Sequence, residues 1–162
     1  MQILLLITSV LVALAAGLFY SYSISVIPGL GRLADREYLH SMQSINRAIL
    51  NPLFFASFLG SLFALPASAW LWYHTRGADN GFYLLLGATL LYCIGVFMVT
   101  VVANVPLNNT LDKLDINAVQ NDRLREHRTA FETPWNRYHT IRTVSNAAAL
   151  VCLLWAVIPL IT

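Results

Sequence analysis

Charged side chains are scarce in this sequence. Asp, Glu, Lys and Arg make up 11% of its 162 residues, whereas about 25% is usual in a soluble domain. Four runs contain none of them: Gln2–Gly31, Ala48–Tyr73, Gly81–Leu111 and Val144–Thr162. A helix that crosses a hydrocarbon core of about 30 Å needs about 20 residues, which each run can supply. A soluble bundle of all-round hydrophobic helices is the alternative, but a chain this short cannot cover four such runs. The composition therefore indicates one integral membrane domain over residues 1–162.

Cysteine and basic clusters are also rare, and each scarcity bears on function. The two cysteines, Cys93 and Cys152, lie inside apolar runs, where a free cysteine behaves as a small buried hydrophobe. A net charge of +2, with no basic cluster interleaved with aromatics, argues against a nucleic-acid partner. No positive residue precedes the first run, which continues to Ile27 and is longer than a signal-peptide core. We therefore predict a retained membrane helix there.

The fold class predicted is all-α, a four-helix transmembrane bundle. The predicted spans are about 3–27, 50–73, 82–105 and 136–158. Pro28 with Gly29 is expected to end the first span, Pro106 the third and Pro159 the fourth. Pro52 and Pro66 are expected to kink the second, which a membrane helix tolerates when neighbours satisfy the released carbonyls.

Two short amphipathic helices are predicted in the loops. In loop 1, residues 32–47, Met42, Ile45 and Ile49 share one helical face. In loop 3 a polar turn over residues 108–115 precedes an amphipathic stretch over 116–131. Thr133–Pro134 has the pattern of an N-cap followed by proline at the first helical position, which predicts a new start for the last helix.

Basic residues in the short loops predict the orientation. Loops 1 and 3 share one side and hold nine of the ten Lys and Arg residues: Arg32, Arg36, Arg47, Lys113, Arg123, Arg125, Arg128, Arg137 and Arg142. The other side has Arg76 alone. The positive-inside rule then places loops 1 and 3 in the cytoplasm and both termini outside, in a bacterial inner or plasma membrane.

Polar residues gather where three predicted helices meet the cytoplasmic side. The groups are Gln43, Asn46 and Asn51 before the second span; Asn104, Asn108 and Asn109 after the third; and Glu132, Trp135, His139 and Arg142 before the fourth. Polar groups at membrane depth are costly and usually face a partner or a cavity. These helix ends are therefore the predicted site.

Helical spacing assigns roles within this set. Trp135, His139 and Arg142 are four and three residues apart, so they project from one face. That face suits a planar organic ligand: Trp135 stacks on it, Arg142 and the amides bind its oxygens, and His139 moves a proton near neutral pH. The structural alternative stays open, because amides also join membrane helices, and Arg and Trp also anchor helices at the interface.

Metal ligation has little support. None of the four histidines, His40, His74, His127 and His139, has a second His or Cys at the usual ligand spacing. Glu132 and His139 are seven residues apart and can share a face. A metal or haem remains a minor alternative, and the leading interpretation requires no cofactor.

Four stretches carry a resemblance that covers nearly the whole chain. They are VIPGLGRL (26–33), MQSINRAILNP (42–52), NVPLNNTL (104–111) and FETPWNRYHTIRT (131–143). In this order they resemble the anthrone oxygenase-like family of small membrane proteins. The resemblance implies a four-helix membrane bundle and, for characterised members, oxidation of an anthrone to an anthraquinone by O2 without a conventional cofactor.

The resemblance extends to individual positions. Asn104, Pro106, Asn108, Trp135 and Arg142 match its motifs. Family members often have Trp-Asn-His where this chain has residues 138–140, Tyr-His-Thr, so the imidazole is shifted by one position, roughly 100° around a helix. The role of His139 therefore depends on its own surroundings.

Two classes of function follow. The first is a membrane oxygenase acting on an anthrone-like or quinol-like aromatic substrate. Its catalytic residues are His139, Arg142, Asn104 and Asn108, and its substrate-binding residues are Gln43, Asn46, Asn51, Trp135 and Glu132. The second is a non-enzymatic component that binds or transports a small molecule, or a subunit of a membrane complex. No acidic residue lies in a span and there is no inverted repeat, which argues against a carrier. The lipid bilayer is the expected environment, and Gly87 with Gly95 suggests a homodimer contact.

Overall fold

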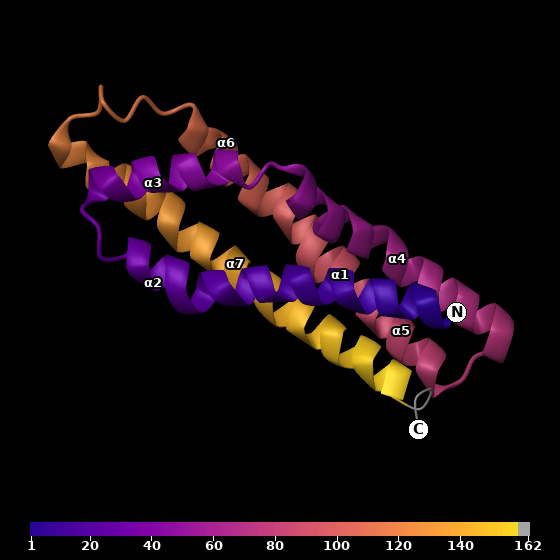
Figure 1. The fold of residues 1–162 in the computed structure, drawn as a ribbon. Helices are drawn as coiled ribbons and strands as arrows, with labels where there is room; N and C mark the ends of the chain where they lie inside the picture. The colour runs from indigo at the N-terminus through magenta and orange to yellow at the C-terminus, as the bar shows by residue number, and fades with distance from the viewer. Residues whose placement is uncertain (159–162) are drawn as a thin grey trace.

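The computed structural model describes residues 1–158 and is helical throughout, as predicted (Figure 1). Four continuous helices, residues 2–30, 52–76, 80–112 and 121–157, are long and apolar enough to cross a membrane. The elements are α1 (Gln2–Ser21), η1 (Tyr22–Val26), α2 (Ile27–Leu30), α3 (Asp35–Ala48), α4 (Pro52–Arg76), α5 (Asn80–Leu90), η2 (Leu91–Met98), η3 (Thr100–Asn104), α6 (Val105–Asp112) and α7 (Asn121–Val157), where η marks π-helical geometry. The predicted end at Pro159 lies outside the described residues.

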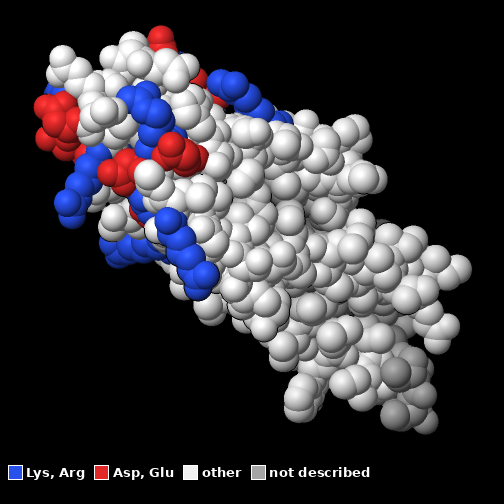
Figure 2. Space-filling view, turned by 60° about the vertical axis from the view of Figure 1, so that its left-hand side comes forward, with Lys and Arg blue, Asp and Glu red and all other residues white. Residues whose placement is uncertain are grey.

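The bundle core is apolar, and so is the surface around it. Leu5, Leu65 and Leu85 are almost completely buried where the helices meet. Large apolar side chains also cover the outside, with Leu53 84% exposed and Phe63 70% exposed. A soluble monomer rarely exposes so much apolar surface, whereas lipid is a favourable neighbour for it. Figure 2 shows the charged side chains gathered at one end, with the rest of that face uncharged.

The charged end is a separate small packing unit. The predicted loop 1 helix is α3, which packs Tyr38, Leu39 and Met42 against the first third of α7. Arg128 joins the two, because its guanidinium contacts Asp35 at 3.0 Å and Glu132 at 2.7 Å and lies over the Tyr38 ring. It also donates to the carbonyls of Gly31 and Leu33, so the α2–α3 turn is held to α7.

Two prolines predicted to end helices lie inside them instead. The first helix continues past Pro28 to Leu30, and the third continues past Pro106 to Asp112, through the expected polar turn. A π-helical segment precedes each proline: η1 before Pro28 and η3 before Pro106. Proline lacks an N–H and its ring crowds the carbonyl four residues earlier. The wider π turn makes hydrogen bonds to the fifth residue back, which accommodates both defects and lets the helix continue.

The predicted restart at Thr133–Pro134 is wrong. Helix α7 runs unbroken from Asn121 to Val157, so residues 121–131 of the predicted amphipathic stretch form its first third and not a separate helix. Pro134 leaves the carbonyl of Ala130 without its helical donor, and Ala130 is exposed, so that loss is tolerable. Pro52 does not kink α4 but begins it, whereas Pro66 does lie inside the helix.

Asp79 fixes the turn between α4 and α5. Its carboxylate accepts from the Phe82 backbone N–H at 2.9 Å and from the Trp72 indole at 2.6 Å. The hydrogen bond from Phe82 is the main reason that the pKa of Asp79 lies below its usual value. Gly81 follows, and any β-carbon there would overlap the Trp72 ring. The short turn therefore keeps α4 and α5 antiparallel neighbours.

Gly95 has a role in packing within the bundle. A β-carbon at Gly95 would overlap the side chain of Ser145 on α7, whereas one at Gly87 would meet nothing within 4 Å. The absence of a side chain at Gly95 therefore lets η2 and α7 approach closely.

We expect Gly95→Ala to lower the thermal stability of the protein in detergent, because overpacking of a close contact costs about 1–3 kcal/mol. Gly87→Ala is the matched control. It should leave the stability unchanged or raise it, since alanine is favoured over glycine in a helix. A double variant, Gly95→Ala with Ser145→Gly, should recover much of the loss. Equal stability of the two single variants would contradict this packing role.

Candidate functional site

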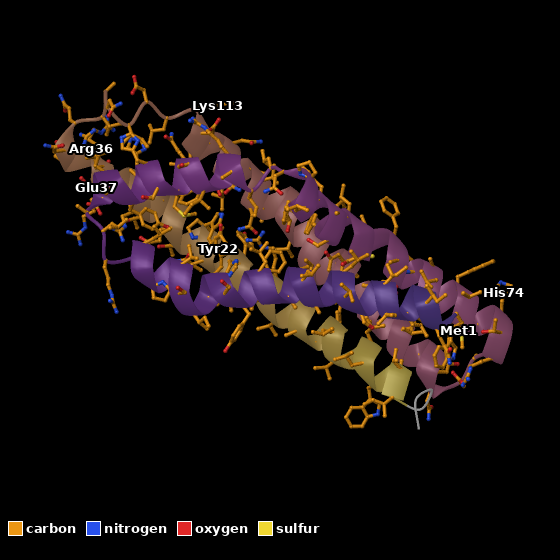
Figure 3. The ribbon with its side chains drawn as sticks, viewed as in Figure 1. Met1, Tyr22, Arg36, Glu37, His74 and Lys113 are labelled. Carbon is orange, nitrogen blue, oxygen red and sulfur yellow. The ribbon has the colours of Figure 1, made fainter. Side chains whose placement is uncertain are left out.

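A cleft lies inside the bundle near its charged end. It encloses about 90 Å³ and receives residues from α1 and η1, from the α3–α4 junction, from η3 and α6, and from α7. Its polar lining is Asn46, Thr100, Asn108, Trp135, His139 and Arg142, together with the phenol of Tyr22. Figure 3 shows Tyr22 on the side of the first helix that faces α3. Five of the predicted site residues thus come together here.

Aromatic rings form one wall of the cleft. The Trp135 and His139 rings are nearly parallel, with centroids 5.1 Å apart, because residues four apart on α7 stack along one face. Tyr22 lies tilted against both rings, at 6.4 Å from Trp135 and 5.9 Å from His139. Phe19 meets His139 edge-on. The wall is therefore a set of aromatic rings that pack on one another beside the cleft.

The hydrogen bonds of His139 define its tautomer. A guanidinium can only donate, so Nδ1 of His139 accepts from Arg142, 3.3 Å away. A carbonyl can only accept, so Nε2 donates to the Phe19 oxygen at 3.2 Å. Ser23 lies 3.1 Å from the same nitrogen and Thr143 lies 3.3 Å from it. The ring is therefore neutral, with its proton on Nε2 and its lone pair directed at Arg142.

Arg142 is buried in this cleft with no carboxylate beside it. Its side chain contacts Thr100 and His139, each at 3.3 Å, and its guanidinium lies 5.0 Å from the Phe19 ring centroid and 5.5 Å from that of Trp135. The residue is 7% exposed, and within residues 1–158 no salt bridge includes it. Its Nε has no hydrogen-bond partner. An unpaired buried charge is costly, so this position favours an anion from outside the chain.

Two asparagines, Asn46 and Asn108, belong to the polar lining, and a third, Asn104, bonds to the backbone of Trp135. Asn108 accepts from the Trp135 indole at 2.8 Å and holds that ring in place. Asn104, which is 1% exposed, donates to the Trp135 carbonyl at 3.4 Å, while its side-chain oxygen has no partner. The amide nitrogen of Asn46 is also buried without a partner. With Arg142 Nε, Asn46 gives the cleft two donors available to a ligand.

Three other predicted site residues lie elsewhere and hold the scaffold. Gln43 donates to the carbonyls of Leu111 and Leu114, at 2.8 and 2.9 Å, which closes the end of α6. Asn51 is the N-cap of α4 and accepts from two backbone N–H groups. Glu132 pairs with Arg128. None of the three lines the cleft.

Several residues at or near the cleft were not predicted. Tyr22 and Ser23 lie in the first charge-free run, where hydroxyl groups resemble ordinary packing residues. Thr100 lies outside the four stretches that carry the resemblance, and Thr143 ends one of them without being singled out. Asn146 lies one turn beyond Arg142, is completely buried, and has no partner for either side-chain polar atom. Its four-residue spacing from Arg142 was the available signal.

The cleft has few side chains of the kinds that metal ions prefer. Over residues 1–158 no group of three or more His, Cys, Asp or Glu side chains is placed to hold a metal ion. The cleft supplies one imidazole, whose two nitrogens already have partners, and several neutral amides. The cleft thus contains an imidazole, a guanidinium and neutral amides.

Comparison with protein families gives a match. A family model described as anthrone oxygenase matches residues 52–152, more than half of the chain. No curated protein and no solved structure matches the chain. The matched range includes Asn104, Asn108, Trp135, His139 and Arg142, and it begins after Asn46 and Tyr22.

Arg142→Met tests whether the buried cation serves the fold or a ligand. A buried charge replaced by an apolar side chain of similar volume often leaves stability unchanged or raises it, so we expect no loss of thermal stability in detergent. Gln43→Leu should instead lower the free energy of unfolding by about 1–3 kcal/mol, because it strands two carbonyls. A larger loss for Arg142→Met than for Gln43→Leu would make Arg142 a structural residue.

Proposed function

Because the chain belongs to the anthrone oxygenase family, we propose that it oxidises an anthrone-like aromatic substrate with O2 inside the membrane. The observation that carries the proposal is Arg142, a buried cation in an aromatic-walled cleft with no carboxylate partner. An anthrone that loses a proton becomes a planar anion with its charge on a ring oxygen. Such a ligand matches the guanidinium, the unpaired amide of Asn46 and the flat wall of Trp135.

The reaction needs a base and an anion site. The methylene of the central ring, activated by the ketone across that ring, loses a proton and leaves an electron-rich anion. That anion passes an electron to O2, the two radicals join, and protonation gives a hydroperoxide at the former methylene carbon. Loss of water then leaves a second ketone. The sum is anthrone plus O2 giving anthraquinone plus water, with four electrons passing from the methylene carbon to oxygen.

His139 and Arg142 act in sequence in this scheme. In the ligand-free cleft, Arg142 donates to Nδ1 of His139. When the guanidinium turns toward the substrate oxygen, the Nδ1 lone pair becomes available to take the methylene proton. Arg142 and Asn46 then stabilise the oxygen anion in a site of low dielectric constant. Asn108 and Asn104 keep Trp135 in position, and the scheme requires no cofactor.

The size of the cleft implies movement at its mouth. At about 90 Å³ it is smaller than the roughly 300–1,000 Å³ of typical ligand sites. Ile49 and Leu50, which line it, belong to the short link between α3 and α4, and Leu50 is 66% exposed. Outward rotation of these two side chains would admit a fused-ring substrate directly from the surrounding lipid.

Oxygen uptake by purified protein with an emodin-type anthrone tests the proposal. Wild-type protein should exceed the spontaneous rate, and Arg142→Met should lower kcat/KM by about 10²–10³, the usual effect of losing an oxyanion donor. His139→Gln should act mainly on kcat, and Asn108→Ala mainly on KM, because Asn108 positions Trp135.

Two matched controls accompany these variants. Arg137→Met removes an exposed arginine from the same helix, and His74→Gln removes a histidine at the opposite end. Both should retain wild-type uptake. Uptake at the spontaneous rate in every sample would reject the oxygenase, and tight binding of the anthrone without uptake would favour the non-enzymatic alternative.

We also propose that the charged end faces the cytoplasm. Figure 3 shows Arg36, Glu37 and Lys113 at one end of the bundle and Met1 and His74 at the other. Nine of ten basic residues belong to the first end, and such an excess marks the cytoplasmic side.

Reporter fusions test this orientation. Alkaline phosphatase, which is active only outside the cytoplasm, should be active when fused after Thr162 and inactive when inserted at Ala118 in the α6–α7 loop. The reverse pattern would invert the topology, while leaving the chemistry of the cleft unaffected.

A further inference from the structure

Two adjoining cavities lie between α6 and α7, outside the catalytic cleft. The first encloses about 260 Å³ and is lined by Thr110, Lys113, His127 and Phe131, among others. The second encloses about 620 Å³ and runs along the bundle between η2–α6 and α7. Leu107 lines both, so the two cavities adjoin at this residue, and together they make up a groove along the third helix and α7. Neither shares a residue with the cleft that holds Arg142.

The first, upper cavity has a mostly apolar lining, but three polar side chains at it suit an anion. Lys113 carries a positive charge, and His127 and Thr110 add hydrogen-bonding groups. Two nearby carboxylates are engaged elsewhere: Asp112 pairs with Arg47 at 2.6 Å, and Asp115 accepts from the Asn117 backbone at 3.1 Å, while Asp122 and Glu126 line a separate hollow that meets this cavity at Ala130. No acidic residue lines this cavity. Figure 3 shows Lys113 at the charged end, where phosphate groups of a membrane would lie.

The second, lower cavity is apolar and has the length of a lipid acyl chain. Met98, Val102, Pro106, Pro134 and Ile141 line it, with Tyr138 as the one residue bearing a polar group. It extends along the third helix from Leu107 to Ile94, about 20 Å at 1.5 Å per residue. One leaflet of the hydrocarbon core is about 15 Å thick. The groove therefore reaches from the charged end across one leaflet.

We propose that this groove binds an anionic glycerophospholipid. The phosphate lies against Lys113, His127 and Thr110, and one acyl chain lies over Pro106 and Pro134 and along Ile141. A free phosphate would use the upper cavity alone, and a neutral phospholipid would lose the charge pairing with Lys113. The adjacency of the two cavities at Leu107 favours a lipid, because a lipid joins an anionic head to a chain of this length. The inference is independent of the proposed oxidation.

Lipid binding to the delipidated full-length protein in detergent tests the proposal. The measurement is native mass spectrometry with phosphatidylglycerol, phosphatidylcholine of the same chains, or inorganic phosphate. Phosphatidylglycerol should bind at least about fivefold more tightly than phosphatidylcholine, as expected for one charge pair near the surface. Lys113→Gln with His127→Gln should remove this preference, whereas Arg32→Gln, a control at an exposed arginine elsewhere at the same end, should keep it.

A second variant tests the lower cavity, where the acyl chain is proposed to lie. Ala103→Phe fills the lower cavity and should weaken the binding of both phospholipids. The remaining binding should still favour phosphatidylglycerol over phosphatidylcholine. Equal affinity for the two phospholipids, or an unchanged preference in the Lys113/His127 double variant, would overturn the proposal. Binding of inorganic phosphate as tightly as phosphatidylglycerol would also overturn it, by reducing the site to an anion pocket.

Discussion

Inside hydrocarbon a polar group has no water to bond with, so each donor and acceptor needs a partner within the protein. Most of this bundle obeys that constraint by local means. Ser61 and Thr89 donate to carbonyls one turn earlier on their own helices, and Thr8 bonds to Ser68 across the α1–α4 contact. The buried phenol of Tyr92 donates to the Phe58 carbonyl. In the cleft, by contrast, Asn46 Nδ2 and Arg142 Nε have no partner within the protein, so both donors are available to a ligand.

The same constraint explains why the cleft lies where it does. Pro28 and Pro106 each remove a backbone donor, and a π-helical segment before each one lets its helix continue. Those two segments carry Tyr22 and Asn104, while Thr100 opens the second. The widened turns thus face α7 at the level of His139 and Arg142. The π-helical segments that let the two helices continue past proline therefore also carry residues of the site.

Sequence reasoning predicted the spans well, because burial in lipid is a matter of composition, and composition is visible in a single chain. It erred at helix ends, where proline was taken as a terminator although a π turn accommodates it. Trp135, His139 and Arg142 were grouped by helical spacing, which is local geometry. Gln43 and Asn51 were assigned to the site, whereas in the structure they bond to backbone groups at the end of α6 and the start of α4. Those bonds depend on packing that a sequence does not display. Tyr22 was missed for a similar reason, since its helix gives no hint of what it faces.

The central claim is that the cleft provides a cation for an anionic aromatic ligand, and a ligand pair tests it most directly. Anthracene-9-carboxylate and anthracene share one ring system and differ in charge, and the fluorescence of both reports binding to purified protein. Replacement of Arg142 by Met should lower the affinity for the carboxylate by tenfold or more, about 1.4 kcal/mol. It should leave the affinity for anthracene unchanged. Equal effects on the two ligands, or no effect on the carboxylate, would contradict the account.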